Sequence, residues 1–206
     1  MLTVYGDLMS GNCYKIKLIL QLLSIPHQWQ HVDILSGETR SAAFLAKNPA
    51  GKIPCLQLDD GEYLSESNAI LHYLAQGSAL IPTDPLTHAR VLQWQFFEQY
   101  SHEPCIAVAR FIARYLGMPD SRRDEYQALQ MSGRQALSIM EQQLTRTPYL
   151  AGEDYSLADI SLYAYTHVAD EGGFNLREFP QICAWLARIE AQPGHQTMAQ
   201  CLAAAS

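Results

Sequence analysis

The 206-residue sequence contains no apolar run approaching the ~20 residues that a membrane-spanning helix needs. Its N-terminus also lacks the basic region and apolar stretch of a signal peptide. We therefore expect no membrane association and a cytoplasmic location. Basic residues are scarce and form no stripe, and the net charge is −7 at pH 7, so we expect no nucleic-acid partner. A hydrophobic content of 48% is enough for the cores of one or two domains.

Cysteine is also sparse, with five residues at positions 13, 55, 105, 183 and 201. Their odd number, wide spacing and lack of a C-x-x-C pair favour reduced thiols over a disulfide framework. The pair His27 and His31 has the spacing of metal ligands on a helix, but its context predicts a strand. On a strand the two rings would be more than ~13 Å apart. We therefore expect no metal site.

The first 77 residues alternate between strand and helix patterns. Strands are predicted at residues 2–5, 28–33, 55–58 and 62–64, the last two joined by the turn residues Asp59-Asp60-Gly61. Apolar residues at helical spacing predict one helix around Ile16 and another from Ser67 to Gly77, with a short helix between them at 39–46. The predicted order is βαβαββα, which makes residues 1–77 an α/β domain.

The rest of the chain has no convincing strand pattern. Residues 78–86 are rich in proline and are predicted to be a linker, and residues 87–206 are predicted to be an all-helical domain. We expect a helix over 86–116, bent at Pro104, and another over 124–144. The segment Ser156-Leu-Ala-Asp159 is a variant of the capping box, so Asp159 is expected to have a structural role.

Three short segments carry the functional signal. Ser10-Gly-Asn-Cys13 follows the first strand, and Ile53-Pro54 precedes the third, because proline cannot donate to the middle of a ladder. If the Ile53-Pro54 bond is cis, Ile53 turns its N–H and C=O toward an extended peptide. Glu66-Ser67 opens a helix whose free N–H groups can hold a carboxylate, with Glu66 beside it for an ammonium group. Together these segments suggest a site for a small zwitterion with a peptide tail.

This ordered set of motifs resembles the cytosolic glutathione S-transferases over nearly the whole chain. The resemblance implies a thioredoxin-like N-terminal domain, a helical-bundle C-terminal domain and a homodimer. It implies that glutathione is the co-substrate and that no metal is used. The residues expected to bind it are Thr39, Lys52, Ile53, Pro54, Glu66 and Ser67.

Ser10 and Asn12 are the candidate catalytic residues. A thiol with a pKa near 8.5 is only a few per cent ionised at neutral pH, and a hydrogen bond to the thiolate is worth about 1.5–3 kcal/mol. Ser10 is expected to donate that bond and Asn12 a second one. The alternatives are that Ser10 only caps a helix and that Asn12 is a turn residue. Cys13 is expected to be a small buried hydrophobe rather than a redox thiol.

The second substrate is expected to be a hydrophobic electrophile bound near Met9, Tyr100 and Arg110. The main hypothesis is transfer of glutathione to that electrophile. The segment from Ser10 through Lys15 is similar to the nu class, which is associated with disulfide reduction by glutathione. Reduction of a small disulfide is therefore an alternative. A non-catalytic protein-interaction module of the same fold is a further alternative, which retention of Ser10 and Glu66-Ser67 disfavours.

Overall fold

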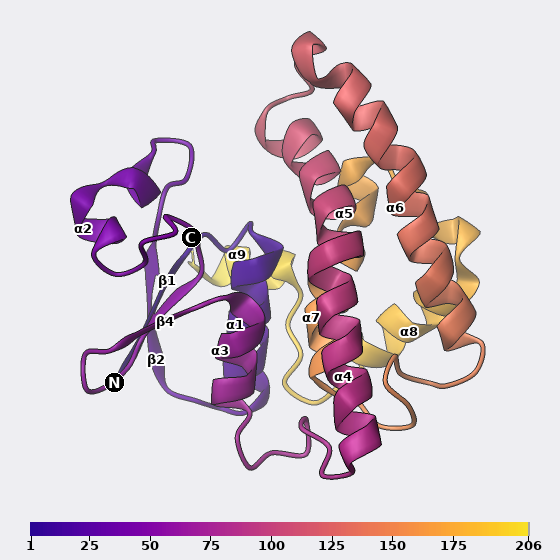
Figure 1. Ribbon diagram of the computed structural model, residues 1–206, viewed down its shortest axis with the longest axis horizontal. Coiled ribbons are helices and arrows are strands. Elements are labelled where there is room, and N and C mark those ends of the chain that lie inside the picture. The colour runs from indigo at the N-terminus through magenta and orange to yellow at the C-terminus, as the bar shows by residue number, and fades with distance from the viewer. Residues whose placement is uncertain (206) are drawn as a thin grey trace. The chain divides into compact units, whose positions relative to one another are not determined.

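The computed structural model describes residues 1–205, which form two compact units (Figure 1). Unit 1 contains Met1–Ser78 together with the segment from Pro193 onward, and unit 2 contains Ala79–Gln192. The segment after Pro193 includes helix α9 (Met198–Ala205). Its placement differs from the expectation that everything after residue 87 belongs to the helical domain. The phenol of Tyr14 donates to the carbonyl of Gln196 at 2.6 Å, and this bond attaches the segment to unit 1.

Unit 1 is built on a four-stranded mixed sheet of order β2-β1-β3-β4. The strands are β1 (Leu2–Gly6), β2 (His27–His31), β3 (Cys55–Gln57) and β4 (Tyr63–Ser65). Strand β1 is parallel to β2 and antiparallel to β3, which is antiparallel to β4. Helices α1 (Gly11–Leu22) and α3 (Ser67–Leu74) cover one face, and α2 (Ala42–Leu45) lies on the other (Figure 1). This is a thioredoxin-like arrangement, and the predicted order βαβαββα is confirmed.

Helix α1 is the centre of unit 1. It contacts α3, and eight of its twelve residues are buried, so its environment is apolar on most sides. The short helix predicted at 39–46 is divided into a 3₁₀ turn, η1 (Glu38–Arg40), and α2. Ser41 separates the two, because its hydroxyl accepts a hydrogen bond from the Phe44 N–H at 3.2 Å and starts a new helix.

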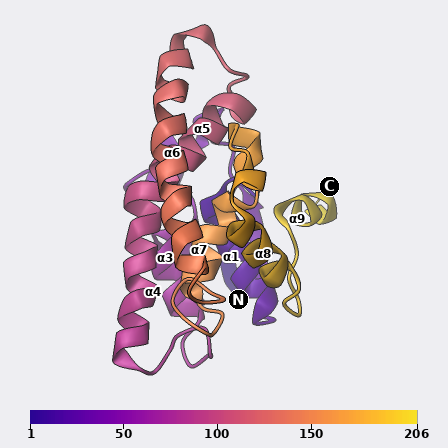
Figure 2. The same cartoon turned by 90° about the vertical axis from the view of Figure 1, so that its right-hand side faces the viewer.

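Unit 2 is all-helical. Its α-helices are α4 (Pro85–Phe97), α5 (Glu103–Arg110), α6 (Arg123–Leu144), α7 (Leu157–Thr166) and α8 (Pro180–Glu190). Every residue of α7 is buried, and this helix contacts α4, α5 and α8 in the interior of the bundle (Figure 2). Short 3₁₀ turns occur at η4 (Asp120–Arg122), η5 (Ala169–Gly172) and η6 (Leu176–Glu178).

The helix predicted over 86–116 is a succession of four segments. Two of them, η2 (Glu98–His102) and η3 (Phe111–Tyr115), are π-helical. Pro104 lies in the first turn of α5, directly after η2. Proline has no N–H for the preceding turn, so the regular hydrogen-bond ladder is interrupted there. The backbone changes its winding at the place where a bend was expected.

Asp159 has the predicted structural role at the start of α7. Its carboxylate accepts hydrogen bonds from the backbone N–H groups of Ser156 and Leu150, both at 3.0 Å, and from the Trp185 indole at 2.9 Å. Asp159 and Trp185 are fully buried. This one side chain therefore joins the loop before α7, the first turn of α7 and α8.

Within residues 1–205, no helix combines the length and apolar character required to span a bilayer. The same part of the chain contains no group of three or more His, Cys, Asp or Glu placed to hold a metal ion.

Candidate functional site

Ser10 occupies the N-cap position of α1, but its side chain does not cap the helix. Its hydroxyl instead forms a hydrogen bond with the Cys13 thiol. The backbone alone makes the turn, since the Ser10 N–H donates to the Asp7 carbonyl at 3.0 Å and the Ser10 carbonyl accepts from Tyr14 at 2.8 Å. The hydroxyl is therefore directed at a side chain of the first turn of α1 and not at a backbone N–H of that turn.

Cys13 is fully buried and packs against Gly6, where an added Cβ would lie 2.7 Å from the cysteine sulfur. Burial raises the pKa of the Cys13 thiol to about 12, although its hydrogen bond with Ser10 acts in the opposite direction. The thiol is thus neutral at physiological pH. Because the thiolate is the reactive form, this supports the interpretation of Cys13 as a small hydrophobe.

The peptide bond between Ile53 and Pro54 is cis. Both ladders of β3 begin at Cys55, which pairs with Tyr5 on one side and Ser65 on the other. The backbone of Ile53 therefore lies outside the sheet, while its side chain packs against the core formed by Val32, Phe44 and Cys55.

The loop before Ile53 contains Lys52, a further predicted residue, and its Gly51 lies against another, Thr39. Gly51 has φ of +61°, and a Cβ there would lie 3.1 Å from the Thr39 carbonyl and 2.6 Å from the Arg40 guanidinium. Thr39 is nearly buried, whereas Lys52 is exposed. The buried Asn48 amide donates to the Lys52 carbonyl at 2.7 Å, which fixes the loop and leaves the lysine ammonium group toward solvent.

Glu66 has an unusual backbone conformation at the N-cap of α3, with φ of 68° and ψ of 112°. Non-glycine residues rarely adopt positive φ, and such strain costs about 1–3 kcal/mol and clusters at ligand sites. Glu66 is exposed, while Ser67 is only 5% exposed and begins the helix. The turn therefore places an acidic side chain in solvent beside the free N–H groups of a helix N-terminus.

A cluster that the sequence motifs did not identify joins the first turns of α1 and α3. The ammonium group of the fully buried Lys15 donates to Asn12 Oδ1 at 2.8 Å and to Ser67 Oγ at 3.2 Å. Ser67 Oγ also donates to Asn12 Oδ1, at 3.1 Å. One signal was present in the sequence: Lys15 is three residues from Asn12 and therefore shares its helix face.

The residues predicted for the second substrate have different environments. Met9 in unit 1 is half-buried, and its N–H donates to Asp7 Oδ1 at 2.9 Å. In unit 2, Tyr100 is 88% exposed on η2. Arg110 is 3% exposed and pairs with Glu171 at 2.8 Å. A substrate that used the Arg110 charge would have to compete with Glu171.

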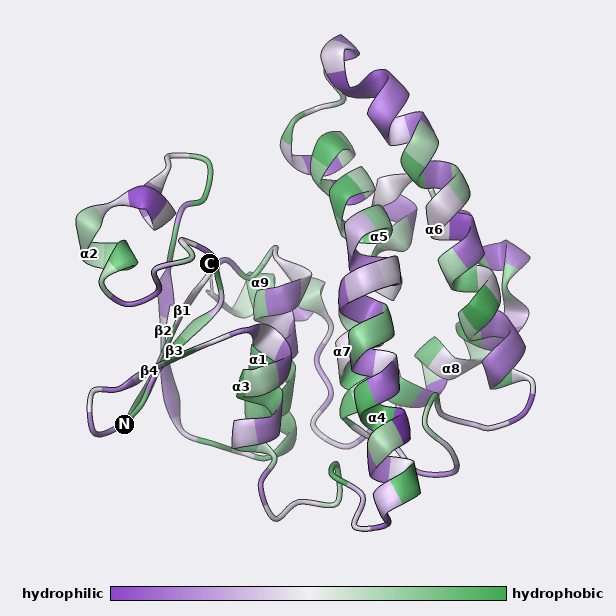
Figure 3. Cartoon of the chain, in the orientation of Figure 1, coloured by the Kyte–Doolittle hydropathy of each residue, from purple (hydrophilic) through white to green (hydrophobic). Residues whose placement is uncertain are grey.

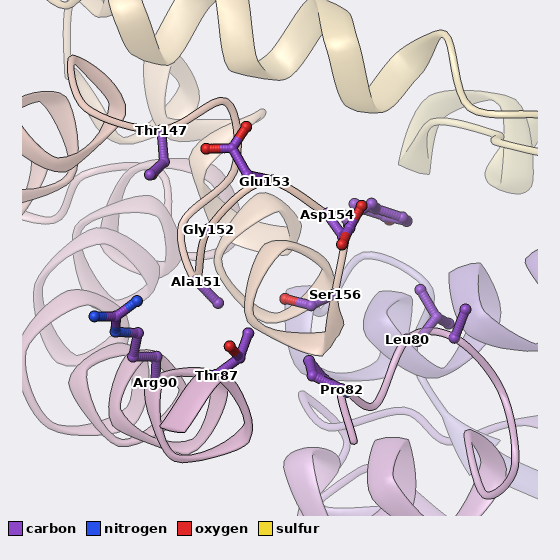
Figure 4. Close-up of a pocket in the computed structure, with 12 residues that line it drawn as sticks. Leu80, Pro82, Thr87, Arg90, Thr147, Ala151, Gly152, Glu153, Asp154 and Ser156 are labelled. Atoms are coloured by element: carbon purple, nitrogen blue, oxygen red, sulfur yellow. The ribbon is translucent and has the colours of Figure 1, made fainter. Parts of the chain in front are cut away.

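A separate cavity of about 770 Å³ lies within unit 2 (Figure 4). It is lined by the segment around Leu80 and Pro82, by Thr87 and Arg90 of α4, and by the loop that precedes α7. None of the predicted site residues lines this cavity. The predicted glutathione residues are all in unit 1.

Two models of the glutathione S-transferase family match the chain, the N-terminal domain over residues 9–76 and the C-terminal domain over residues 105–193. A glutathione S-transferase from Pseudomonas fluorescens has a crystal structure with a TM-score of 0.94 and 62% identity, covering 96% of this chain and 98% of that one. Glutathione S-transferase 3 of Zea mays is 31% identical in an alignment 207 positions long, which covers 95% of this chain and 91% of the relative.

A homologue from Sulfitobacter was solved with bound glutathione. It matches with a TM-score of 0.81 and 25% identity, covering 100% of this chain and 98% of that one. By these matches the chain belongs to the glutathione S-transferase family and is an enzyme of that class. The family resemblance and the two-part fold predicted from the sequence are thereby confirmed.

Proposed function

We propose that unit 1 binds glutathione across the N-terminal ends of α1 and α3, and that Ser10 stabilises the glutathione thiolate for attack on an electrophilic small molecule. The observation that carries this proposal is the Ser10 hydroxyl, which lies at the start of α1 without capping it. A thiolate is a stronger hydrogen-bond acceptor than the neutral Cys13 thiol that Ser10 contacts now. The Sulfitobacter structure with bound glutathione supports the choice of ligand.

The peptide is held by three groups of residues in this proposal. The γ-glutamyl carboxylate binds at Ser67 and the N–H groups of α3, and Glu66 holds the adjacent ammonium group. The backbone of Ile53, oriented by Pro54, pairs with the cysteinyl residue. Lys52 and Thr39 lie at the glycyl end, where the exposed Lys52 supplies a positive charge for the second carboxylate.

At the sulfur, Ser10 donates the main hydrogen bond and Asn12 a second one. Lowering a thiol pKa by two units requires roughly 2.7 kcal/mol, and one hydrogen bond to a charged acceptor supplies about 1.5–3 kcal/mol. The N-terminus of α1 adds a smaller favourable field for an anion. Met9, which follows β1 beside Ser10, is the residue of unit 1 proposed to contact the electrophile.

We also infer a homodimer located in the cytoplasm. Large apolar side chains are exposed on α4 and α6 of unit 2, where apolar and polar residues alternate along the helices (Figure 3). Phe96 is 71% exposed and Met131 is 75% exposed. Such exposure favours a protein contact. All five cysteines are free, which fits a reducing compartment.

The test is a comparison of two reactions catalysed by the purified enzyme. We expect conjugation of glutathione to a chloronitroarene to be faster than glutathione-dependent reduction of a small mixed disulfide, and to decrease strongly in Ser10→Ala. Faster disulfide reduction would favour the alternative reaction, which needs no protein cysteine. Absence of both activities, with no binding of glutathione in calorimetry, would contradict the proposed function.

A further inference from the structure

Lys15 is a charged side chain in the interior of unit 1. It lies on α1 between Tyr14 and Ile16, and all three residues are fully buried. Burial of an ammonium group is costly unless polar groups surround it. Two of the polar groups that Lys15 contacts belong to Asn12 and Ser67, which are both assigned to glutathione. The buried charge of Lys15 is therefore hydrogen-bonded directly to the proposed glutathione site.

The directions of the three hydrogen bonds show which donors and acceptors of these side chains are already used. Lys15 has only donors, so Ser67 Oγ must accept at their 3.2 Å contact. The hydroxyl hydrogen of Ser67 is then directed elsewhere, and it is donated to Asn12 Oδ1 at 3.1 Å. Asn12 Oδ1 accepts from Lys15 as well, at 2.8 Å. Ser67 is thus held by Lys15 through its oxygen and keeps a rotatable donor.

A carboxylate at the N-terminus of α3 would compete for that donor. Hydrogen bonds to an ionised acceptor are roughly twice as strong as those to a neutral amide. The Ser67 hydrogen can therefore turn from Asn12 to the carboxylate, while Lys15 keeps its contacts with both residues. The resulting chain runs from the ammonium group through the Ser67 hydroxyl to the carboxylate, and each bond in such a chain polarises the next.

We propose that Lys15 is a positioning residue for the α-carboxylate of the γ-glutamyl group, acting through the hydroxyl of Ser67. This inference rests on the proposed function. The ammonium group fixes the Ser67 oxygen, strengthens its hydroxyl as a donor and places a positive charge one hydroxyl away from the bound anion. Because the low polarity of the interior screens charges weakly, this charge acts more strongly than one at the surface.

The test compares two ligands that differ only in the carboxylate. One is glutathione, and the other is 4-aminobutanoyl-cysteinylglycine, which lacks the α-carboxylate of the γ-glutamyl group. Lys15→Met removes the charge, keeps a long side chain and leaves the bond between Ser67 and Asn12 in place. Lys17→Met is the matched control, because Lys17 is on the same helix but contacts His27 and Trp29.

NMR titration measures both ligands, since it covers dissociation constants into the millimolar range. We expect Lys15→Met to weaken glutathione binding roughly tenfold or more, the loss expected for a contact with a charged group. Binding of the analogue should change less than twofold, and Lys17→Met should change neither. Thermal unfolding of the free variants controls for the fold, and Lys15→Gln replaces Lys15→Met if the latter does not fold.

Equal weakening of both ligands would give Lys15 a merely structural role and overturn the inference. So would unchanged glutathione binding in Lys15→Met. Failure of the wild-type enzyme to bind glutathione is a different outcome, because it would contradict the proposed function before any variant is considered.

Discussion

Ser10 illustrates how a small side chain acquires a chemical role from its surroundings. A serine at an N-cap usually accepts a hydrogen bond from a backbone N–H of the first turn. Here the hydroxyl contacts the neutral thiol of the buried Cys13 instead. A bound thiolate would be a better acceptor, so the hydroxyl can change partner without disturbing the helix.

The first prediction concerns Ser10→Ala. Without the hydroxyl, the pKa of the bound glutathione thiol should rise by about one to two units, which corresponds to the loss of one hydrogen bond to an anion. Glutathione affinity should remain largely intact. Thiolate absorbance titration of the complex measures the pKa, with the exposed Ser36→Ala as control. An unchanged titration would remove Ser10 from the mechanism.

A second prediction concerns the carboxylate end of the ligand. Ser67→Ala should weaken glutathione binding by about 1–2 kcal/mol, because a hydrogen bond to a charged group is lost while the N–H groups of α3 remain. Calorimetry on Ser67→Ala and Ser36→Ala measures the difference. A dissociation constant equal to that of the wild type would count against a carboxylate site at α3.

For single residues, the sequence predicted the place in a helix or loop better than it predicted the hydrogen-bond partners of the side chain. The sequence places Ser10 between the first strand and the first helix and places Ser67 at the start of another helix, because both positions follow from local patterns. The bonds of Lys15 with Asn12 and Ser67 were not predicted. The contact between Lys15 and Ser67 joins residues 52 positions apart, and only the folded sheet brings them together.

Among the elements, α7 depends on the buried carboxylate of Asp159. Burial raises the pKa of Asp159 to about 6, while hydrogen bonds from Leu150, Trp185 and Ser156 act in the opposite direction. The ordinary value is 3.8. The folded state therefore binds this proton more tightly than the unfolded state does. The resulting stabilisation is fully present below about pH 4 and is lost as the pH rises through about 6.

The third prediction follows from this loss of stabilisation with rising pH. Urea unfolding of the wild type and of Asp159→Asn should be compared at several values between pH 4 and pH 7, because the amide does not titrate in this range. The wild type should lose stability relative to Asp159→Asn as the pH rises. A constant difference across the range would show that Asp159 has an ordinary pKa in the folded state.

Regular elements were predictable where the apolar residues follow a single helical spacing, as in α6. Its bounds are Arg123–Leu144, against a prediction of 124–144. The π-helical segments η2 and η3 were not predicted, because an extra residue per turn leaves no clear trace in hydrophobic spacing. Pro104 indicated that something would change near η2, but its missing N–H does not determine whether the helix bends or widens.

For the whole molecule, the placement of the C-terminal segment could not be predicted. Its helical pattern resembles that of the preceding helices, so continuity along the chain suggested unit 2. Long-range hydrogen bonds with α1 attach this segment to unit 1. One of them joins Tyr14 and Gln196, which are 182 positions apart. The order of strands and helices was predictable, because alternation along the chain specifies it directly.

The assembly gives a fourth prediction. If the exposed apolar residues of unit 2 form the homodimer interface, Phe96→Glu should convert the protein to a monomer, because a buried unpaired charge is costly. Analytical ultracentrifugation measures the mass. Leu35→Glu is the matched control, since Leu35 is 61% exposed in unit 1. A wild-type monomer, or a Phe96→Glu dimer, would contradict this interface.

The most direct test of the account is a crystal structure of the wild-type enzyme with glutathione. We predict that the ligand sulfur lies within hydrogen-bond distance of the Ser10 hydroxyl, with the γ-glutamyl carboxylate at Ser67. A ligand whose sulfur points away from the loop between β1 and α1, or density for glutathione elsewhere on the protein, would contradict the central claim.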